Sequence, residues 1–147
     1  MGKNRDQDII DEQQRLIGLD PKELALMVVD IKKYFYVAYD KKKIKLAVDS
    51  LSLGTKQGEC FCLLGVNGAG KTTFFRMLTG ELKPSEGNFF IEGVDAVKNP
   101  SLIRDKIGYC PQIDPLLDIL SVEEHLYLFA GLKGIPNNLK NSLIRVK

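Results

Sequence analysis

The order of apolar and polar positions divides the chain into short segments with turn residues between them. Dense or alternating apolar runs predict strands at residues 24–30, 44–53 and 88–93. A further run at 60–65 is apolar at nearly every position, which is typical of a central strand in a parallel sheet, covered on both faces. A last short strand is predicted at 107–110.

Helical spacing of apolar residues is found between and after these strands. Residues 72–80 show this spacing and stop at a glycine, a common residue at a helix C-terminus. Residues 99–106 begin near a proline, which is favoured at a helix start. Ser121 and Glu124 form the pattern of a capping box, so a helix is predicted over 121–134.

Polar segments surround these elements. Residues 1–20 mix charges with glutamine and asparagine and show only a short helical pattern, so they are predicted to be a tail or the end of a linker. Residues 40–43, Asp-Lys-Lys-Lys, are predicted to form a solvated turn. A final helix is predicted to begin near residue 137.

Composition limits the classes of function. The chain has 147 residues, the length of one domain, and its net charge of +2 does not indicate a nucleic-acid-binding protein. The longest apolar run, Cys60–Val66, is far shorter than the roughly 20 residues of a membrane span, and the polar N-terminus does not indicate a signal peptide. The three cysteines are predicted to be buried free thiols: Cys60, Cys62 and Cys110.

A glycine-rich loop lies between the strand predicted at 60–65 and the helix predicted at 72–80. Residues 65–72 read Gly-Val-Asn-Gly-Ala-Gly-Lys-Thr and match the motif G-x-x-x-x-G-K-[ST] in full. The glycines let main-chain N–H groups turn inward toward an anion, and the helix N-terminus adds about half a positive charge. Lys71 supplies a point charge for the β- and γ-phosphates, and the Thr72 hydroxyl is suited to coordinate Mg²⁺. The loop therefore predicts a nucleotide-phosphate site formed by Gly65, Asn67, Gly68, Ala69, Gly70, Lys71, Thr72 and Thr73.

The sequence around this loop resembles one family. The resemblance is carried by AVDSLSL (47–53), GECFCLLGVNGAGKTTFFRMLTGELKPSEGNFFIEG (58–93) and IGYCPQIDPLLDILSVEEHLYLFAGLKGIP (107–136). These stretches resemble the nucleotide-binding domain of ATP-binding cassette (ABC) transporters, and they are most similar to subfamily A, the lipid-exporter branch. The resemblance runs from about Leu26 to about Pro136. It implies an α/β fold: a P-loop NTPase core with an N-terminal antiparallel β part, incomplete, and the start of a helical subdomain.

The resemblance also implies a division of the chain. Residues 1–23 are expected to be a polar tail or linker, 24–119 the N-terminal part of the nucleotide-binding core, and 120–147 the start of the helical subdomain, truncated. The family's LSGGQ-like signature, Walker B aspartate, catalytic glutamate and switch histidine are not found in this sequence. The chain is therefore expected to bind ATP but to hydrolyse it poorly by itself. The alternative is a non-hydrolysing nucleotide-binding or transporter-pairing module.

Two further site residues follow from the resemblance. Gln112, in Tyr-Cys-Pro-Gln, matches the family's Q-loop glutamine, which contacts Mg²⁺ and the attacking water and relays the nucleotide state to the transmembrane domain. An aromatic residue ahead of the glycine loop stacks on adenine in this family. Tyr34 aligns best with that role, with Tyr36 and Tyr39 as alternatives.

Two other residues imitate catalytic patterns and are interpreted as structural. Asp30 ends an apolar run as a Walker B aspartate would, but it precedes the glycine loop and is assigned to an ordinary first strand. His125 lies within a predicted helix and is interpreted as a satisfied surface or helix-interface residue. The implied cofactors are ATP and Mg²⁺, and the implied partners are a transmembrane domain and a second nucleotide-binding domain. The expected location is the cytoplasmic face of a membrane, without direct membrane insertion by this chain.

Overall fold

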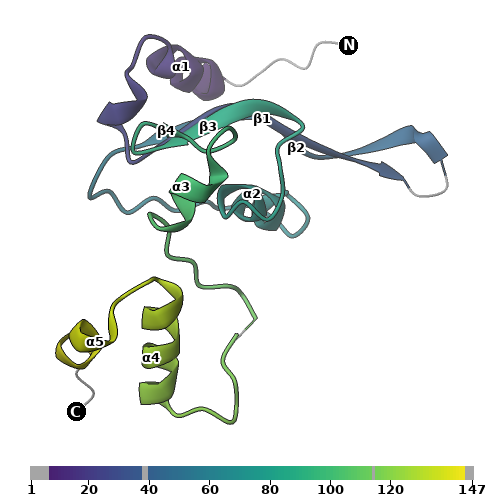
Figure 1. Ribbon diagram of the computed structural model, residues 1–147. Helices are drawn as coiled ribbons and strands as arrows, with labels where there is room; N and C mark the ends of the chain where they lie inside the picture. Colours follow the sequence, from purple (N-terminus) through teal and green to yellow (C-terminus); the bar gives the residue numbers. More distant parts are fainter. Residues whose placement is uncertain (1–6, 38–39, 114, 145–147) are drawn as a thin grey trace. The chain divides into compact units, whose positions relative to one another are not determined.

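The computed structural model describes residues 7–37, 40–113 and 115–144 (Figure 1). The chain divides into two compact units, Met1–Ile107 and Gly108–Lys147. In the described part of the chain, no helix combines the length and the apolar character that a membrane crossing requires.

The first unit is built around an antiparallel sheet with the strand order β2-β1-β3-β4. Its strands span Leu26–Val37 (β1), Asp40–Thr55 (β2), Glu86–Ile91 (β3) and Val94–Asp95 (β4). Its helical elements are α1 (Gln7–Leu16), the 3₁₀ turn η1 (Pro21–Glu23), α2 (Lys71–Leu78) and α3 (Pro100–Arg104).

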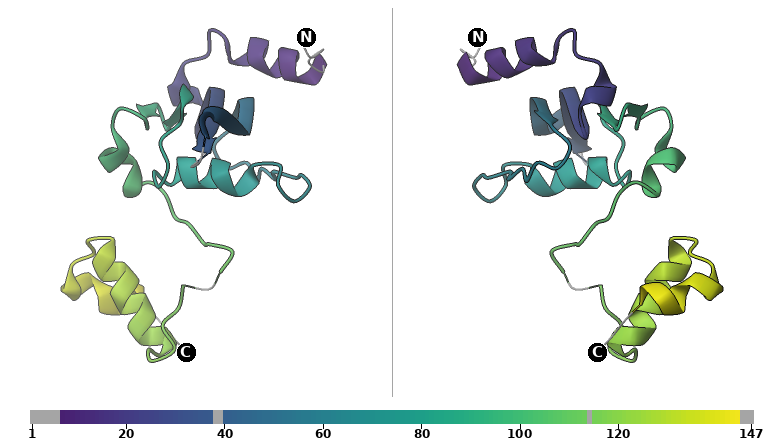
Figure 2. Two further views of the ribbon diagram at one scale, coloured as in Figure 1. Left: turned by 90° about the vertical axis from the view of Figure 1, so that its right-hand side faces the viewer. Right: turned by 90° about the vertical axis from the view of Figure 1, so that its left-hand side faces the viewer.

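Helices α1 and α2 lie on opposite faces of this sheet (Figure 2). The cause is the alternation of side chains along β1, because successive residues of a strand point to opposite faces. Met27 is buried with Leu16 of α1, whereas Val28 is buried with Phe74 and Met77 of α2. Burying an apolar side chain of this size contributes about 1.5–3 kcal/mol, so both helices are held by the sheet.

Several predicted elements are confirmed. The strands predicted at 24–30, 44–53 and 88–93 correspond to β1, β2 and β3. The helices predicted at 72–80 and 99–106 correspond to α2 and α3. β1 and β2 are longer than predicted because they pair with one another as a long hairpin, which continues beyond the apolar runs.

The turn predicted at residues 40–43 is wrong, because the main chain of these residues belongs to β2. Charged side chains do not prevent a segment from continuing a strand, and the pairing with β1 includes Asp40 at the start of this segment and Ile44 directly after it. The short helical pattern near the N-terminus corresponds to α1, which packs on the sheet through Leu16.

Residues 60–65 do not form the central parallel strand that their apolar character predicted. Their main chain is irregular, and the side chains of Phe61 and Leu64 are 48% and 84% exposed. An apolar run becomes a strand only where a neighbouring strand bonds its N–H and C=O groups. Within the described residues the sheet is antiparallel throughout and supplies no parallel neighbour for this run. The prediction of a strand at 60–65 therefore failed because a pairing strand is lacking in the described sheet, although the side chains are those of a covered strand.

The strand predicted at 107–110 is wrong for the same reason, since the main chain there is also irregular. The cysteines are free, as predicted, but all three are exposed: Cys60, Cys62 and Cys110. Each lies in one of these two irregular segments, so the predicted burial failed together with the predicted strands.

The second unit contains α4 (Val122–Leu132) and α5 (Asn137–Leu143), and the capping box predicted for α4 is confirmed. Ser121 Oγ accepts a hydrogen bond from the Glu124 N–H at 3.3 Å, and Glu124 Oε2 accepts from the Ser121 N–H at 2.7 Å. Two main-chain donors at the start of α4 thus receive partners within the helix's own first turn.

His125 is packed and satisfied, which confirms its interpretation as a structural residue. Its Nε2 accepts a hydrogen bond from the Leu117 N–H at 2.9 Å, and its Nδ1 lies 2.9 Å from the carbonyl oxygen of Ser121. The ring stacks on Phe129 and the residue is only 8% exposed. A neutral imidazole with its proton on Nδ1 satisfies both contacts, so this histidine fixes the turn that leads into α4.

Candidate nucleotide-binding site

The glycine loop turns sharply into α2. Gly68 and Gly70 have φ values of 86° and 88°, in the left-handed region that glycine adopts without steric cost. Gly70 is the N-cap residue of α2, so no side chain covers the main-chain amides of the first helical turn. A Cβ atom at Gly70 would lie 2.2 Å from the carbonyl oxygen of Ala47 in β2. The loop therefore needs glycine here both for its turn and for its close approach to the sheet.

The side chain of Lys71 folds back over the loop. Its Nζ donates hydrogen bonds to the carbonyl oxygens of Gly65 at 2.5 Å and Val66 at 2.9 Å. The Ala69 N–H also bonds to Val66 O, at 3.2 Å, and closes the turn. The loop thus carries a cation on its own main chain, which places positive charge beside the N-terminus of α2.

Helix α2 begins with groups suited to an anion. No acidic side chain lies in its first turn, where a negative charge would compete with a phosphate. Thr72 is exposed and Thr73 is half-buried in that turn. Phe74 anchors the same turn, because it is buried in the core and its N–H bonds to the Gly70 carbonyl at 2.9 Å. The amides and hydroxyls at this end of α2 are therefore held by the core behind them.

A cavity of about 440 Å³ opens beside the loop. Its lining residues come from β2, from the irregular segment before the loop, and from the loop and α2: Leu46, Ala47, Val48, Asp49, Leu51, Leu63, Leu64, Gly68, Ala69, Gly70, Lys71 and Phe74. This volume lies within the usual range for small-molecule sites, which is about 300–1,000 Å³. The polar loop and the apolar strand together suit a ligand with a charged end and a flatter, less polar end.

The aromatic residue expected from the family resemblance lies on β1. In the hairpin, Tyr34 is opposite Leu46, one of the residues that line the cavity. The rings of Tyr34 and Tyr36 meet edge to face with centroids 6.0 Å apart, so these two side chains share one face of the strand. Tyr39 lies outside the described residues.

Phe35 lies on the other face of β1. Lys33 Nζ lies 5.2 Å from the centroid of the Phe35 ring and donates to the carbonyl oxygen of Lys83 in the segment after α2, at 2.7 Å. Ile31, two residues before Lys33, is buried in the core with α2. Since alternate strand residues share a face, Phe35 is directed to the side of the sheet that carries α2. In the sequence, the alternation of strand residues from Ile31 through Lys33 to Phe35 is the signal that would have indicated Phe35 as a candidate for the adenine contact.

Gln112 lies in the second unit, apart in sequence from the glycine loop of the first. It is exposed, in the irregular segment between Ile107 and α4. Among the described residues, no group of three or more histidine, cysteine, aspartate or glutamate side chains is arranged to hold a metal ion.

Asp30 lies within β1, as the sequence indicated, at an irregular point of the strand. Its φ is 47°, and its N–H donates to Ser52 Oγ at 2.9 Å. The pairing of β1 with β2 shifts register at this point, so Asp30 belongs to a bulge of the hairpin.

The glycine loop, the helix behind it and the sheet define the N-terminal part of a P-loop NTPase fold. The family model described as ABC transporter matches residues 48–146, and the chain belongs to this family. Two solved structures share the fold. "Structure of ATP binding subunit of ABC transporter" is 29% identical with a TM-score of 0.64, covering 78% of this chain and 45% of that one. "Dimeric Structure of MJ0796, a Bacterial ABC Transporter Cassette" is 22% identical with a TM-score of 0.67, covering 80% and 53%.

Curated relatives place the chain near subfamily A of the ABC transporters. It is 46% identical over 131 residues to the phospholipid-transporting ATPase ABCA3 of Homo sapiens, which covers 89% of this chain and 8% of the relative. It is 41% identical over 133 residues to the retinal-specific phospholipid-transporting ATPase ABCA4 of Bos taurus, covering 90% and 6%. The chain thus spans less than a tenth of the length of these relatives.

Proposed function

We propose that the chain binds ATP in the cavity beside residues 65–73, as the N-terminal part of the nucleotide-binding domain of an ABC transporter. The observation that carries the proposal is the position of Lys71. Its ammonium group is held over the glycine loop by two carbonyl oxygens, next to the uncapped amides of α2 and a cavity of about 440 Å³. This combination of directed N–H groups and fixed charge suits the β- and γ-phosphates.

The phosphate contacts are proposed for the loop and the start of α2. The family resemblance assigns them to Gly65, Asn67, Gly68, Ala69, Gly70, Lys71, Thr72 and Thr73. The exposed Thr72 hydroxyl would hold Mg²⁺. Mg²⁺ usually takes one or two protein oxygens and completes its shell with phosphate and water, so one hydroxyl at the start of α2 suits the ion. The family resemblance also assigns an Mg²⁺ contact to Gln112. Bound Mg²⁺ would neutralise phosphate charge.

The adenine contact is proposed for Phe35 in place of Tyr34. The ring of Phe35 is directed to the face of the sheet that carries α2, whereas Tyr34 and Tyr36 share the opposite face. Phe35 is 37% exposed, so part of its ring is available for stacking.

The wider function is proposed from the relatives. ABCA3 and ABCA4 are phospholipid-transporting ATPases by name. We propose that the full-length protein couples ATP hydrolysis to lipid transport, together with a transmembrane domain and a second nucleotide-binding domain, at the cytoplasmic face of a membrane. In that setting Gln112 would orient the attacking water. The proposed division of the chain remains 1–23, 24–119 and 120–147.

Binding of Mg-ATP is expected to raise the melting temperature of the chain. A ligand at 100 times its Kd stabilises the folded state by about 2.7 kcal/mol, which for this size of protein corresponds to roughly 8 °C. The measurement is a thermal melt across a titration of Mg-ATP, with Mg²⁺ alone as the control. A melting temperature that stays constant across the titration would contradict the proposed function.

Replacing Phe35 by alanine is expected to weaken Mg-ATP binding by about 10-fold, because stacking of a base on an aromatic ring is worth about 1–3 kcal/mol. The matched control is Tyr34→Ala on the opposite face of the same strand, which is expected to change the Kd by less than twofold. Fluorescence titration with a labelled ATP analogue gives both values. The reverse order of effects would assign the adenine contact to Tyr34.

A further inference from the structure

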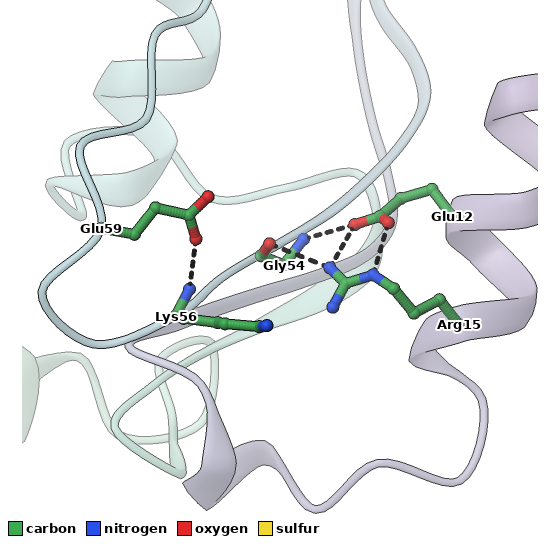
Figure 3. Close-up of polar contacts among 5 residues, drawn as sticks. All are labelled: Glu12, Arg15, Gly54, Lys56 and Glu59. Carbon is green, nitrogen blue, oxygen red and sulfur yellow. Dashed lines mark hydrogen bonds and ion pairs between the residues drawn. The ribbon is translucent and has the colours of Figure 1, made fainter.

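Two charged side chains of helix α1 form hydrogen bonds with the edge strand of the sheet (Figure 3). Glu12 Oε1 accepts a hydrogen bond from the Gly54 N–H at 2.8 Å, and Arg15 Nη2 donates to the Gly54 carbonyl oxygen at 3.0 Å. Arg15 also donates two bonds of 2.7 Å to the Glu12 carboxylate. The pair therefore bonds both polar main-chain groups of one residue of β2, an edge strand, much as a neighbouring strand would. We call Glu12, Arg15 and Gly54 the α1 clamp.

The clamp fits its position closely. A Cβ atom at Gly54 would lie 2.7 Å from Leu16 Cδ2, 2.8 Å from Arg15 Nη2 and 2.9 Å from Leu24 Cδ1. An added methyl group would therefore have to displace the ends of these side chains, including the Arg15 Nη2 that bonds to the Gly54 carbonyl. The bond to Arg15 is also the main cause that holds the pKa of Glu12 below its ordinary value, so the carboxylate is charged at neutral pH.

The rest of α1 is loosely packed on the sheet. Leu16 is the buried residue of this helix, and Ile17 directly after it is 79% exposed. A cavity of about 350 Å³ opens beside α1, β1 and β2; it is lined by Gln13, Leu16, Ile17, Met27, Val29, Asp30 and Ser52. The fully buried apolar contact of α1 is thus a single side chain, and the clamp adds hydrogen bonds to the main chain of β2.

Strand β2 connects the clamp to the phosphate cavity. It runs from Gly54 to the residues of the cavity wall at 46–51. Between these points its pairing with β1 is irregular, because the register shifts on both sides of Leu51 and Ser50 has a φ of 51°. A bulge interrupts the ladder of hydrogen bonds, so β1 alone holds this part of β2 less firmly than regular pairing would. The clamp adds a second attachment just beyond the irregular part.

We propose that Glu12 and Arg15 are positioning residues for the nucleotide site: by fixing Gly54 they hold β2 in the register that shapes the cavity wall at 46–51. The part of this proposal that concerns nucleotide affinity rests on the proposed function. The part that concerns the order of the strand does not. Helix α1 then contributes to the nucleotide site, because it orders the strand that lines the cavity.

The test compares three forms of the full chain by amide hydrogen exchange in the absence of nucleotide. In the double variant Glu12→Ala/Arg15→Ala, exchange is expected to quicken by about 10-fold at Gly54 and also across residues 46–51, since local opening becomes easier. The matched control is Gln14→Ala on the exposed side of the same helix, which is expected to exchange like the unchanged chain. Fast exchange at Gly54 with unchanged exchange at 46–51 would overturn the proposal, because α1 would then shield Gly54 from solvent without ordering the cavity wall.

Conservative variants separate the hydrogen bonds from general destabilisation. Glu12→Gln keeps an oxygen that accepts from the Gly54 N–H, so it is expected to stay within about threefold of the unchanged chain in exchange at 46–51. Gly54→Ala leaves both charges in place, but its Cβ would lie 2.8 Å from Arg15 Nη2 and would push that donor away from the main-chain carbonyl of residue 54. It is therefore expected to quicken exchange at 46–51 toward the level of the double variant. If Glu12→Gln is as disruptive as the double variant, the main-chain bond is not the cause and the proposal fails.

Nucleotide affinity provides the second readout. The double variant is expected to bind Mg-ATP about 5-fold more weakly, and Mg-ATP is expected to slow exchange at Gly54 in the unchanged chain, since coupling between two sites is reciprocal. Unchanged affinity in the double variant would overturn the positioning role. If the unchanged chain binds no Mg-ATP, the proposed function fails, and exchange at 46–51 still decides whether the clamp orders the strand.

Discussion

Replacing Lys71 by alanine is expected to abolish most of the thermal stabilisation that Mg-ATP provides. A charged hydrogen bond to phosphate is worth about 1.5–3 kcal/mol, which corresponds to a loss of affinity of about 10- to 100-fold. At a Mg-ATP concentration of 100 times the original Kd, a 100-fold loss reduces the stabilisation from about 2.7 to about 0.4 kcal/mol. The melting shift should therefore fall to roughly 1 °C in a thermal melt.

The unliganded variant should remain folded, because within the described part of the chain the Lys71 ammonium bonds to the carbonyl oxygens of Gly65 and Val66, both on the loop itself. Its ligand-free stability is expected to fall by no more than about 1 kcal/mol. The control is Lys56→Ala, which removes the same charge from an exposed turn. That variant should keep the full response to Mg-ATP. An equal response in the Lys71 variant would contradict the phosphate assignment.

Replacing Gly70 by alanine is expected to destabilise the first unit by about 2–5 kcal/mol and to abolish nucleotide binding. An alanine at a φ of 88° costs about 1–2 kcal/mol. Its Cβ would also lie 2.2 Å from the Ala47 carbonyl oxygen, and overpacking of this kind costs about 1–3 kcal/mol more. The loop can relieve the overlap only by moving away from β2, which displaces the N-terminus of α2. Urea unfolding measures the loss of stability.

Gly68 provides the matched control for this substitution. Its φ of 86° is nearly the same, but an added Cβ would meet no atom within 4 Å. Gly68→Ala is therefore expected to carry the conformational cost alone, about 1–2 kcal/mol. If the two alanine variants unfold at the same urea concentration, contact with β2 does not constrain the loop.

The glycine loop could be predicted from sequence because its geometry is local. Positive φ values at Gly68 and Gly70, the helix start at Lys71 and the exposed Thr72 all follow from residue types within eight positions. The capping box of α4 is similarly local. In both cases the groups that satisfy the main chain lie in the same short segment.

The parts that the sequence did not predict depend on partners far along the chain. Residues 60–65 have the side chains of a covered strand, but strand formation needs a neighbour that the described sheet does not supply. The family resemblance favours Tyr34 for the adenine contact, which stays a prediction; Phe35 became a second candidate only through strand alternation counted from the buried Ile31. The contact of Glu12 with Gly54 joins residues 42 positions apart, and nothing in the polar N-terminal pattern indicates it.

The open segment at 60–65 also has a consequence for the chemistry of the chain. Its two thiols, Cys60 and Cys62, are exposed on either side of Phe61. Accessible thiols are the ones that oxidants and alkylating reagents reach, and oxidation beyond the sulfenic acid is in general irreversible. A sulfinic or sulfonic group at either position would carry a permanent negative charge into an apolar run. Burying such a charge inside a sheet would be costly, so an oxidised segment could not become a covered strand. Whether residues 60–65 can pair with another strand therefore depends on whether these thiols have been oxidised.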